Sequence, residues 1–265
     1  MKVADNSKEF SVFDGLADFA DGCERRGTTR NTCEDEWAGG SGKDALAFAR
    51  HGDVSHVVEA ERILEKLGTE IDSDGVRPVW TPAVVGNFPL VPAYLAGTPE
   101  AMLARTDVPD ARGEIEVWAD PTASGVCDQK DMVRRGVVTM AFTMALSRVR
   151  NVRMVVYTTN GVGDVVIRLA SPMDVSEVCA AFCQTSITRH LIYAWSHSYG
   201  WSGAWARWSE VKAGRDVERT TLEKLAGMPN DAVHLSVEKL GEYSSVSDDD
   251  LVKILNGKLR EVAGK

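Results

Sequence analysis

The chain has 265 residues, of which 44% are hydrophobic and 26% charged, a composition typical of a globular protein. Its 30 basic and 39 acidic residues give a net charge of −9, which argues against a general nucleic-acid coat. No apolar run reaches the roughly 18–20 residues of a membrane span, and residues 1–15 lack the apolar core of a signal peptide. We therefore expect a cytoplasmic protein that does not enter a membrane.

The cysteines are odd in number and scattered along the chain. Five cysteines without an export signal predict reduced thiols rather than a disulfide framework. Cys179 and Cys183 lie four residues apart in a predicted helix, where small buried side chains are the simplest interpretation. A zinc site would need further ligands, and no Cys-x-x-Cys pair supplies them.

The first third of the chain is expected to be helical and peripheral. Residues 1–35 are polar and mixed, which favours an extension wrapped on the body. Residues 43–52 predict a short helix closed by a glycine. Residues 55–68 carry an apolar stripe at helical spacing and predict a second helix. We expect residues 36–109 to form a helical and proline-rich segment that packs on the core.

Residues 76–106 contain five prolines, which exclude a long helix or a central strand. We expect an ordered loop packed on the body, with a short helix over residues 99–105 because Pro99 suits the first helical turn.

From residue 110 to 265 the pattern alternates between strands and helices, which indicates the α/β class and an open, doubly wound sheet. Strands are predicted over 113–120, 152–160, 164–171, 190–197 and 232–240, and helices over 131–149 and 174–183. The helix over 131–149 is apolar around most of its circumference, as expected of a helix buried against a sheet. Ser247 and the three aspartates that follow it predict the capped start of a closing helix.

A glycine-rich segment at residues 39–43, GGSGK, invites comparison with a phosphate-binding loop. Lys43 is followed by Asp44 where the magnesium-binding hydroxyl should stand, and no strand precedes the segment. The sequence therefore argues against a nucleotide site here.

A second motif carries more information. Asp120, Thr122 and Ser124 lie directly after the predicted strand 113–120 and before the long helix. Open α/β sheets bind ligands outside the carboxyl ends of their strands. One carboxylate and two hydroxyls at alternate positions can converge there on Mg²⁺. The alternative stays open that these are ordinary loop and capping residues.

The D-x-T-x-S segment resembles the D-x-S-x-S metal-adhesion motif of von Willebrand factor A (vWA) domains. The wider chain is similar to a family of phage and prophage proteins with a vWA-like core. The matching segments are EWAGGS at 36–41, VPAYLAGTPEAM at 91–102, WADPTAS at 118–124 and QTSITRHLIYAW at 184–195.

The resemblance implies a doubly wound sheet that binds other proteins rather than a catalyst. It implies that Thr185 or Thr188 completes the cation site with Asp120, Thr122 and Ser124. The aspartate of the family pattern is missing, because the later segment runs into Trp195 and Ser196, so the motif is degenerate. The resemblance also implies a MoxR- or CobS-like AAA+ ATPase as a partner.

Aromatic residues gather near residue 200, where four tryptophans fall between 195 and 208. Burial beneath the C-terminal segment is the preferred interpretation. If exposed, Trp201 and Trp205 are candidate partner-binding residues. Five arginines at 134, 135, 148, 150 and 153 flank the long helix and are interpreted as solvated charges at its ends.

The sequence thus predicts a non-enzymatic phage-type protein-binding module, located in the cytoplasm of a bacterial host and able to form oligomers. Two alternatives stay open: a virion or assembly component, and a nucleic-acid-associated factor that uses a local arginine patch. An enzyme has the least support, because no motif supplies a matched acid–base pair or an activated nucleophile.

Overall fold

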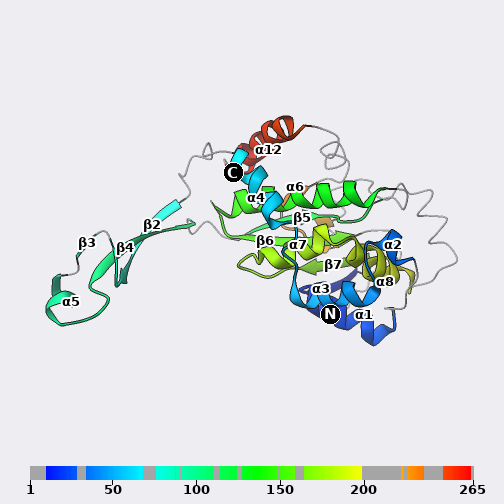
Figure 1. Ribbon diagram of the computed structural model, residues 1–265, viewed down its shortest axis with the longest axis horizontal. Helices are drawn as coiled ribbons and strands as arrows, with labels where there is room; N and C mark the ends of the chain where they lie inside the picture. The colour runs from blue at the N-terminus through cyan, green and yellow to red at the C-terminus, as the bar shows by residue number, and fades with distance from the viewer. Residues whose placement is uncertain are drawn as a thin grey trace.

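The computed structural model describes residues 10–28, 34–67, 76–86, 88–89, 91–109, 114–123, 127–148, 150–158, 164–198, 222–223, 226–235 and 247–263. They form an α/β body with a three-stranded arm that stands away from it (Figure 1). No helix among these residues is both long enough and apolar enough to span a lipid bilayer.

The body is built on a mixed, mostly parallel sheet of five strands. Their order is β1–β7–β6–β5–β8, and only β6 and β7 run antiparallel to each other. The strand bounds are β1 Phe10–Asp14, β5 Ile115–Ala119, β6 Val152–Thr158, β7 Asp164–Arg168 and β8 Val233–Leu235. The α/β class, the strands β5, β6, β7 and β8, and the alternation with helices are confirmed.

Two long helices cover one face of the sheet. α6 Gln129–Ser147 and α7 Val175–Cys183 contribute to a single core with strand residues such as Val117, Met154 and Ile167. α6 is buried on most sides, as its sequence predicted, because further helices pack on it from outside. These outer helices are α4 Val57–Lys66 and α12 Asp248–Ala263, whereas α3 Gly42–His51 packs on α7.

The other face of the sheet carries Trp118, Val155, Tyr157 and Val166. They pack against residues in 222–232, a segment that the structure describes only in part. A doubly wound arrangement, with helices on both faces, therefore stays a prediction.

Helix starts follow the capping rules that the sequence suggested. Ser41 and Asp44 form a capping box at the start of α3, since the Ser41 hydroxyl accepts the Asp44 amide and the Asp44 carboxylate accepts the Ser41 amide. The GGSGK segment thus ends in a helix cap. Ser247 likewise accepts the Asp250 amide at 3.3 Å, which confirms the predicted cap of α12.

The N-terminal region differs from the expected polar extension. Residues 10–14 form β1, an edge strand parallel to β7, and α1 Leu16–Arg26 follows it. Phe13, Phe19 and Cys23 are buried in the body core. A strand of five residues among polar neighbours has little periodic signal, and its partner β7 lies about 150 positions later in the chain.

The segment predicted as strand 190–197 is helical instead. A π-helix, η2 Ile187–Ile192, continues into α8 Tyr193–His197. Every side chain from Ile187 to Ser196 is buried. A continuous apolar run fits a buried helix as well as a buried strand, so the pattern could not decide between them.

The proline-rich region forms an arm rather than a loop packed on the body. β2 Val76–Ala83, β3 Phe88–Pro89 and β4 Met102–Pro109 make a separate antiparallel sheet with β4 in the middle. Pro78 and Pro82 lie on the edge strand β2, where a missing amide donor is tolerated. The expected helix over 99–105 is absent because most of that stretch belongs to β4.

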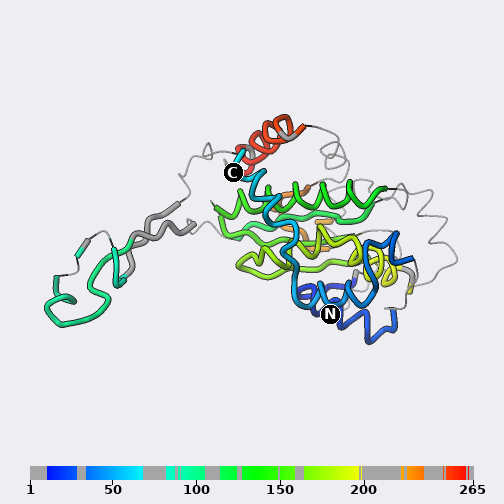
Figure 2. The backbone as a smooth tube through the Cα atoms, viewed as in Figure 1, coloured from blue at the N-terminus to red at the C-terminus, as the bar shows by residue number. Residues whose placement is uncertain are grey.

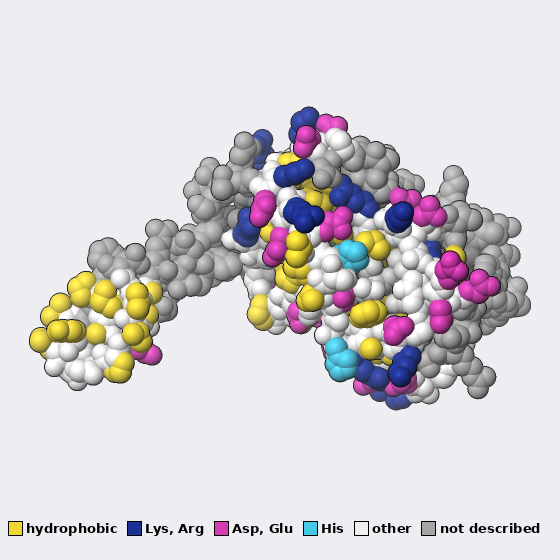
Figure 3. Space-filling view, viewed as in Figure 1, with side chains coloured by type: hydrophobic (Ala, Val, Ile, Leu, Met, Phe, Trp, Pro, Cys, Tyr) yellow, Lys and Arg dark blue, Asp and Glu magenta, His cyan; other side chains and the backbone are white. Residues whose placement is uncertain are grey.

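The only helix of the described arm is α5 Val91–Leu95. Figures 1 and 2 show the outer part of the arm lying clear of the body, and Figure 3 shows hydrophobic side chains gathered over it.

The remaining short helix is α2 Asp35–Ala38. Cys23, Cys179 and Cys183 are buried free thiols and Cys127 is partly exposed, whereas Cys33 lies outside the described residues. The predicted packing role of Cys179 and Cys183 is confirmed.

Candidate functional site

The loop after β5 places Asp120 and Thr122 together at the carboxyl end of a central strand. Both side chains are buried, with exposed fractions of 5% and 2%. The Thr122 amide donates to Asp120 Oδ1 at 2.8 Å, a bond typical of an Asx turn. The loop thus turns back on its own carboxylate. Ser124, the third residue of the motif, lies outside the described residues.

Arg135 is a buried cation that stabilises the backbone of this loop. It projects from α6, is itself buried, and its Nη2 donates to the carbonyls of Pro121 at 2.6 Å and Thr122 at 2.8 Å. Two charge-assisted bonds from one guanidinium fix the backbone of the loop. The expectation of a solvated Arg135 was wrong, because the loop folds over α6 and covers it.

The electrostatics of the site are dominated by burial. Burial raises the pKa of Asp120, while the hydrogen bonds of Thr122 and the positive charge of Arg135 act in the opposite direction. Burial also lowers the pKa of Arg135, and the Asp120 charge opposes that shift. Carboxylate and guanidinium therefore compensate each other inside the protein.

Thr185 serves a different part of the structure. Its hydroxyl donates to the Ala38 carbonyl at 2.9 Å, at the end of α2. Gly39 follows with φ +82°, and a Cβ there would lie 2.2 Å from Thr185 Oγ1. Glycine is therefore required at this turn both for its backbone conformation and for space. The hydroxyl is committed to a carbonyl rather than facing a cation. Thr188, the alternative threonine, is also buried.

Two further residues tie the loop to the helical segment 187–197, and no sequence motif indicated either of them. The Tyr193 hydroxyl donates to the Ala123 carbonyl, and burial raises the pKa of Tyr193 to about 12. Arg189 Nη2 donates to the Cys127 carbonyl at 2.7 Å, and its guanidinium stacks 4.1 Å from the Trp37 ring centroid. Tyr193 lies in the predicted strand 190–197 and Arg189 directly before it, so the helical path that brings them to the loop could not be anticipated.

The arrangement does not fit an open Mg²⁺ site. Mg²⁺ prefers exposed oxygen ligands that leave room for several waters. Here the carboxylate is buried, one of its oxygens accepts an amide, and a guanidinium already supplies positive charge nearby. Among the described residues, no cluster of three acidic, histidine or cysteine side chains is placed to hold a metal ion.

We therefore expect titration of the protein with Mg²⁺ or Mn²⁺ to give no heat attributable to Asp120. Calorimetry on wild-type protein and the Asp120→Asn variant should give indistinguishable curves. A heat of binding that the substitution abolishes would contradict this expectation, provided circular dichroism shows that the variant is folded.

The aromatic cluster is buried where the structure describes it. The Trp195 ring has an exposed fraction of 6% and meets Phe13 edge-on at 5.1 Å between ring centroids. Trp201 and Trp205, the candidate partner-binding residues, lie outside the described residues.

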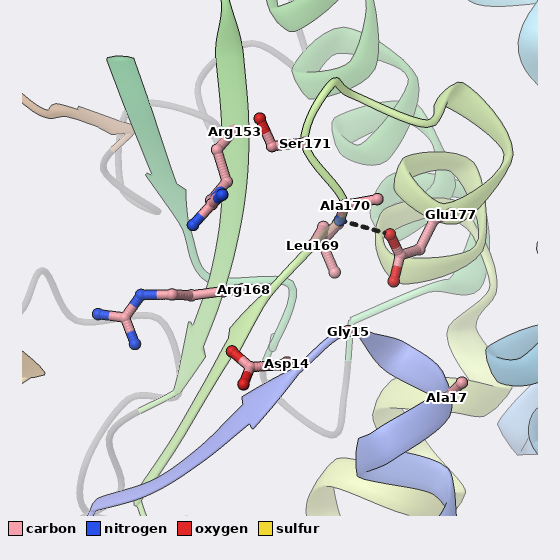
Figure 4. Close-up of a pocket in the computed structure, with 9 residues that line it drawn as sticks. All are labelled: Asp14, Gly15, Ala17, Arg153, Arg168, Leu169, Ala170, Ser171 and Glu177. Atoms are coloured by element: carbon pink, nitrogen blue, oxygen red, sulfur yellow. Dashed lines mark hydrogen bonds between the residues drawn. The ribbon is translucent and has the colours of Figure 1, made fainter. Parts of the chain in front are cut away.

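Two shallow cavities lie at the surface of the body, and the first adjoins the end of the Asp120 loop at Cys127 and Asp128. One, of about 570 Å³, is lined by residues that include Trp37, Lys130 and Arg189. The other, of about 330 Å³, lies where β1 and β7 end (Figure 4). Arg189 in the first cavity and Arg153, Arg168 and Glu177 in the second already have partners.

In the second cavity Glu177 accepts the Ala170 amide at 2.7 Å, and Arg168 lies 3.7 Å from Glu116. Arg153 lies 3.1 Å from Glu114. These pairs hold the ends of the strands together.

Comparison with known proteins places the chain in a family but near no curated relative. Neither the curated proteins nor the solved structures gave a match. One family profile, a domain of unknown function (DUF7192), matches residues 4–212, which include the helical segment, the arm and most of the sheet. The chain therefore belongs to the DUF7192 family.

Proposed function

We propose that this protein is a non-enzymatic protein-binding module whose main contact surface is the end of its arm. The observation that carries the proposal is a group of large, exposed apolar side chains there, which we call the arm tip. Its members and their exposed fractions are Val84 67%, Val85 81%, Val91 57%, Tyr94 73% and Leu95 79%.

The arm tip is a concentrated apolar surface. Its five side chains, each more than half exposed, fall within the twelve residues 84–95. Large exposed apolar patches on monomeric proteins are often functional. An isolated strand pair is also only marginally stable in water, so a partner that covers the tip would stabilise the arm.

The arm favours side-chain docking over the addition of another strand. β2 is an edge strand, and Pro78 and Pro82 deprive it of two amide donors that an incoming strand would use. A partner is therefore expected to bind the apolar side chains of the tip.

The Asp120 loop supports a binding module more than an enzyme. Its titratable groups are buried and their hydrogen bonds go to the local backbone, so they offer no exposed group for proton transfer. We propose that this loop is a rigid part of the scaffold.

The finer expectations from the family resemblance remain proposals. The D-x-T-x-S segment starts after a central strand and precedes the longest helix, which is in keeping with a vWA-like core. We propose that the chain is a phage-type protein in the cytoplasm of a bacterial host. We also propose a MoxR- or CobS-like AAA+ ATPase as its partner, and binding of this ATPase should be compared between the wild-type protein and variants of the arm tip.

A photoreactive benzoylphenylalanine at position 94 tests the proposal in cells that make the protein naturally. We expect a discrete protein adduct of the full chain after irradiation, because Tyr94 is a tip residue with an exposed fraction of 73%. The same group at position 25, an exposed residue on α1, is the matched control. Equal labelling from both positions, or none from position 94, would overturn the proposed function.

A further inference from the structure

The cavity at the ends of β1 and β7 has the position of a ligand site. Its volume of about 330 Å³ lies near the lower end of the roughly 300–1,000 Å³ found for small-molecule pockets. β1 and β7 run parallel, and open α/β sheets bind ligands outside the carboxyl ends of such strands. The Glu177 carboxylate accepts the Leu16 amide at 2.9 Å and the Ala170 amide at 2.7 Å (Figure 4). The segments that follow the two strands are therefore held together beside the cavity.

Two arginines of neighbouring strands line this cavity. Arg168 on β7 lies opposite Val155 on β6, and Arg153 stands two residues before Val155. Residues two apart in a strand point to the same side of the sheet, so Arg153 and Arg168 are diagonal neighbours on that side. Their side chains are only 33% and 24% exposed. Two partly buried positive charges therefore lie within reach of one bound group.

Each arginine has a glutamate beside it, but neither guanidinium donates a hydrogen bond within the described part of the chain. Arg153 Nε lies 3.1 Å from a Glu114 oxygen and is not aligned to donate to it. Arg168 Nε lies 3.7 Å from Glu116, beyond hydrogen-bond distance. Glu114 instead accepts the Ser171 hydroxyl, and Glu116 accepts an indole N–H at 2.8 Å. The glutamates thus reduce the local positive charge and leave the guanidinium donors unused.

A carboxylate accompanies the arginines from the neighbouring strand β1. Asp14 lies directly opposite Arg168 in the register of β1 and β7, and both residues line the cavity. Figure 4 shows the Asp14 carboxylate and the Arg168 guanidinium on the same side of the strands. They nevertheless form no ion pair with each other, and no described residue donates a hydrogen bond to the Asp14 carboxylate. The cavity therefore contains two guanidinium groups and, separated from them, one carboxylate.

We propose that this cavity binds a free α-amino acid. The carboxylate of the ligand accepts hydrogen bonds from Arg153 and Arg168, because the planar guanidinium matches a carboxylate in shape and charge. The ammonium group of the ligand lies against Asp14. A zwitterion brings both charges that this arrangement matches. A plain anion such as phosphate would be repelled by Asp14 and the two glutamates, and a plain cation by the two arginines.

Isothermal titration calorimetry of the full chain with each of the standard α-amino acids tests the proposal. We expect at least one of them to bind. Arg168→Gln should raise its dissociation constant roughly tenfold or more, because the substitution removes charge-assisted hydrogen bonds. Asp14→Asn should raise it about two- to fivefold, as expected for a pair that involves an exposed carboxylate. If the wild-type protein binds no amino acid, the proposal is wrong.

Two derivatives of the amino acid that binds separate the two contacts. The N-acetyl derivative keeps the carboxylate and loses the ammonium charge, so Arg168→Gln should still weaken its binding and Asp14→Asn should not. The amide derivative keeps the ammonium and loses the carboxylate charge, so the effects of the two substitutions should be reversed. Binding of the N-acetyl derivative as tight as that of the amino acid itself would show that the ammonium is not recognised, and would overturn the zwitterion.

Exposed residues outside the cavity supply the matched controls. Arg25→Gln on α1 and Asp249→Asn on α12 remove the same charges and should leave binding unchanged. Arg168→Lys keeps the positive charge but loses the planar donor group, so it should restore only a small part of the affinity. Circular dichroism confirms that each variant is folded. Equal losses from the cavity and control variants would assign the effect to overall charge and contradict the site. The site uses no residue of the arm tip, so its failure leaves the proposed function untouched.

Discussion

Replacing Arg135 with methionine should lower the free energy of unfolding by about 3–5 kcal/mol, because it breaks two buried hydrogen bonds from a charged donor, each worth about 1.5–3 kcal/mol. The substitution removes two donors from the Pro121 and Thr122 carbonyls and leaves the buried Asp120 carboxylate without its nearby cation. Urea denaturation followed by circular dichroism measures the loss. Methionine approximates the volume of the arginine stem, so a packing defect contributes little.

The neighbouring Arg134 provides the matched control. It lies on the same helix, but its side chain is partly exposed and its guanidinium lies 3.9 Å from Glu59. Pairs of this kind contribute about 0–1 kcal/mol, so Arg134→Met should have a small effect. Equal losses from the two substitutions would show that burial of Arg135 does not matter for stability.

The pH dependence identifies the electrostatic part of the Arg135 effect. Burial raises the folded-state pKa of Asp120 above its unfolded value, so the folded chain binds this proton more tightly. The associated stability is fully present below the unfolded pKa and is lost as the pH rises through the folded pKa. Without Arg135 that pKa rises further. The destabilisation by Arg135→Met should therefore shrink as the pH is lowered toward the unfolded pKa of about 4, leaving the cost of the lost carbonyl bonds.

These residues also show how far the sequence alone could lead. Asp120 and Thr122 are close in sequence and follow a strongly alternating strand, so their place at the end of β5 was predictable. Arg135 was misjudged because two adjacent arginines near a helix start usually face water. Its burial depends on the loop that covers α6, and no local pattern reports such a tertiary contact.

The same distinction explains the fold. The strands and helices between residues 113 and 183 have clear periodicity and were predicted correctly. β1 was missed because it is short and pairs with a distant strand. The arm was missed because proline was weighed as a strand breaker, although Pro78 and Pro82 lie on an edge strand that tolerates them. The prediction of a strand over residues 190–197 was wrong because a uniformly buried segment shows neither the helical nor the strand period.

Replacing Gly136 with alanine should destabilise the protein by about 3 kcal/mol, at the upper end of the range for overpacked cores. A Cβ at this position of α6 would lie 2.2 Å from the Phe182 carbonyl oxygen and 2.9 Å from Cys183 Sγ, both on α7. The Phe182 oxygen belongs to the backbone, so no side-chain rotation relieves the clash, and the two helices would have to separate. That movement would weaken the contact between α6 and α7, which lie in the core between the sheet and the outer helices.

Gly257 on α12 is the matched control for this prediction, because a Cβ there meets no atom within 4 Å. Alanine is favoured over glycine inside a helix by about 0.5–1 kcal/mol, so Gly257→Ala should stabilise the protein. Thermal and urea denaturation of both variants measures the two effects, which have the same chemistry and opposite signs. If Gly136→Ala were neutral or stabilising, the close approach of α6 and α7 would be wrong.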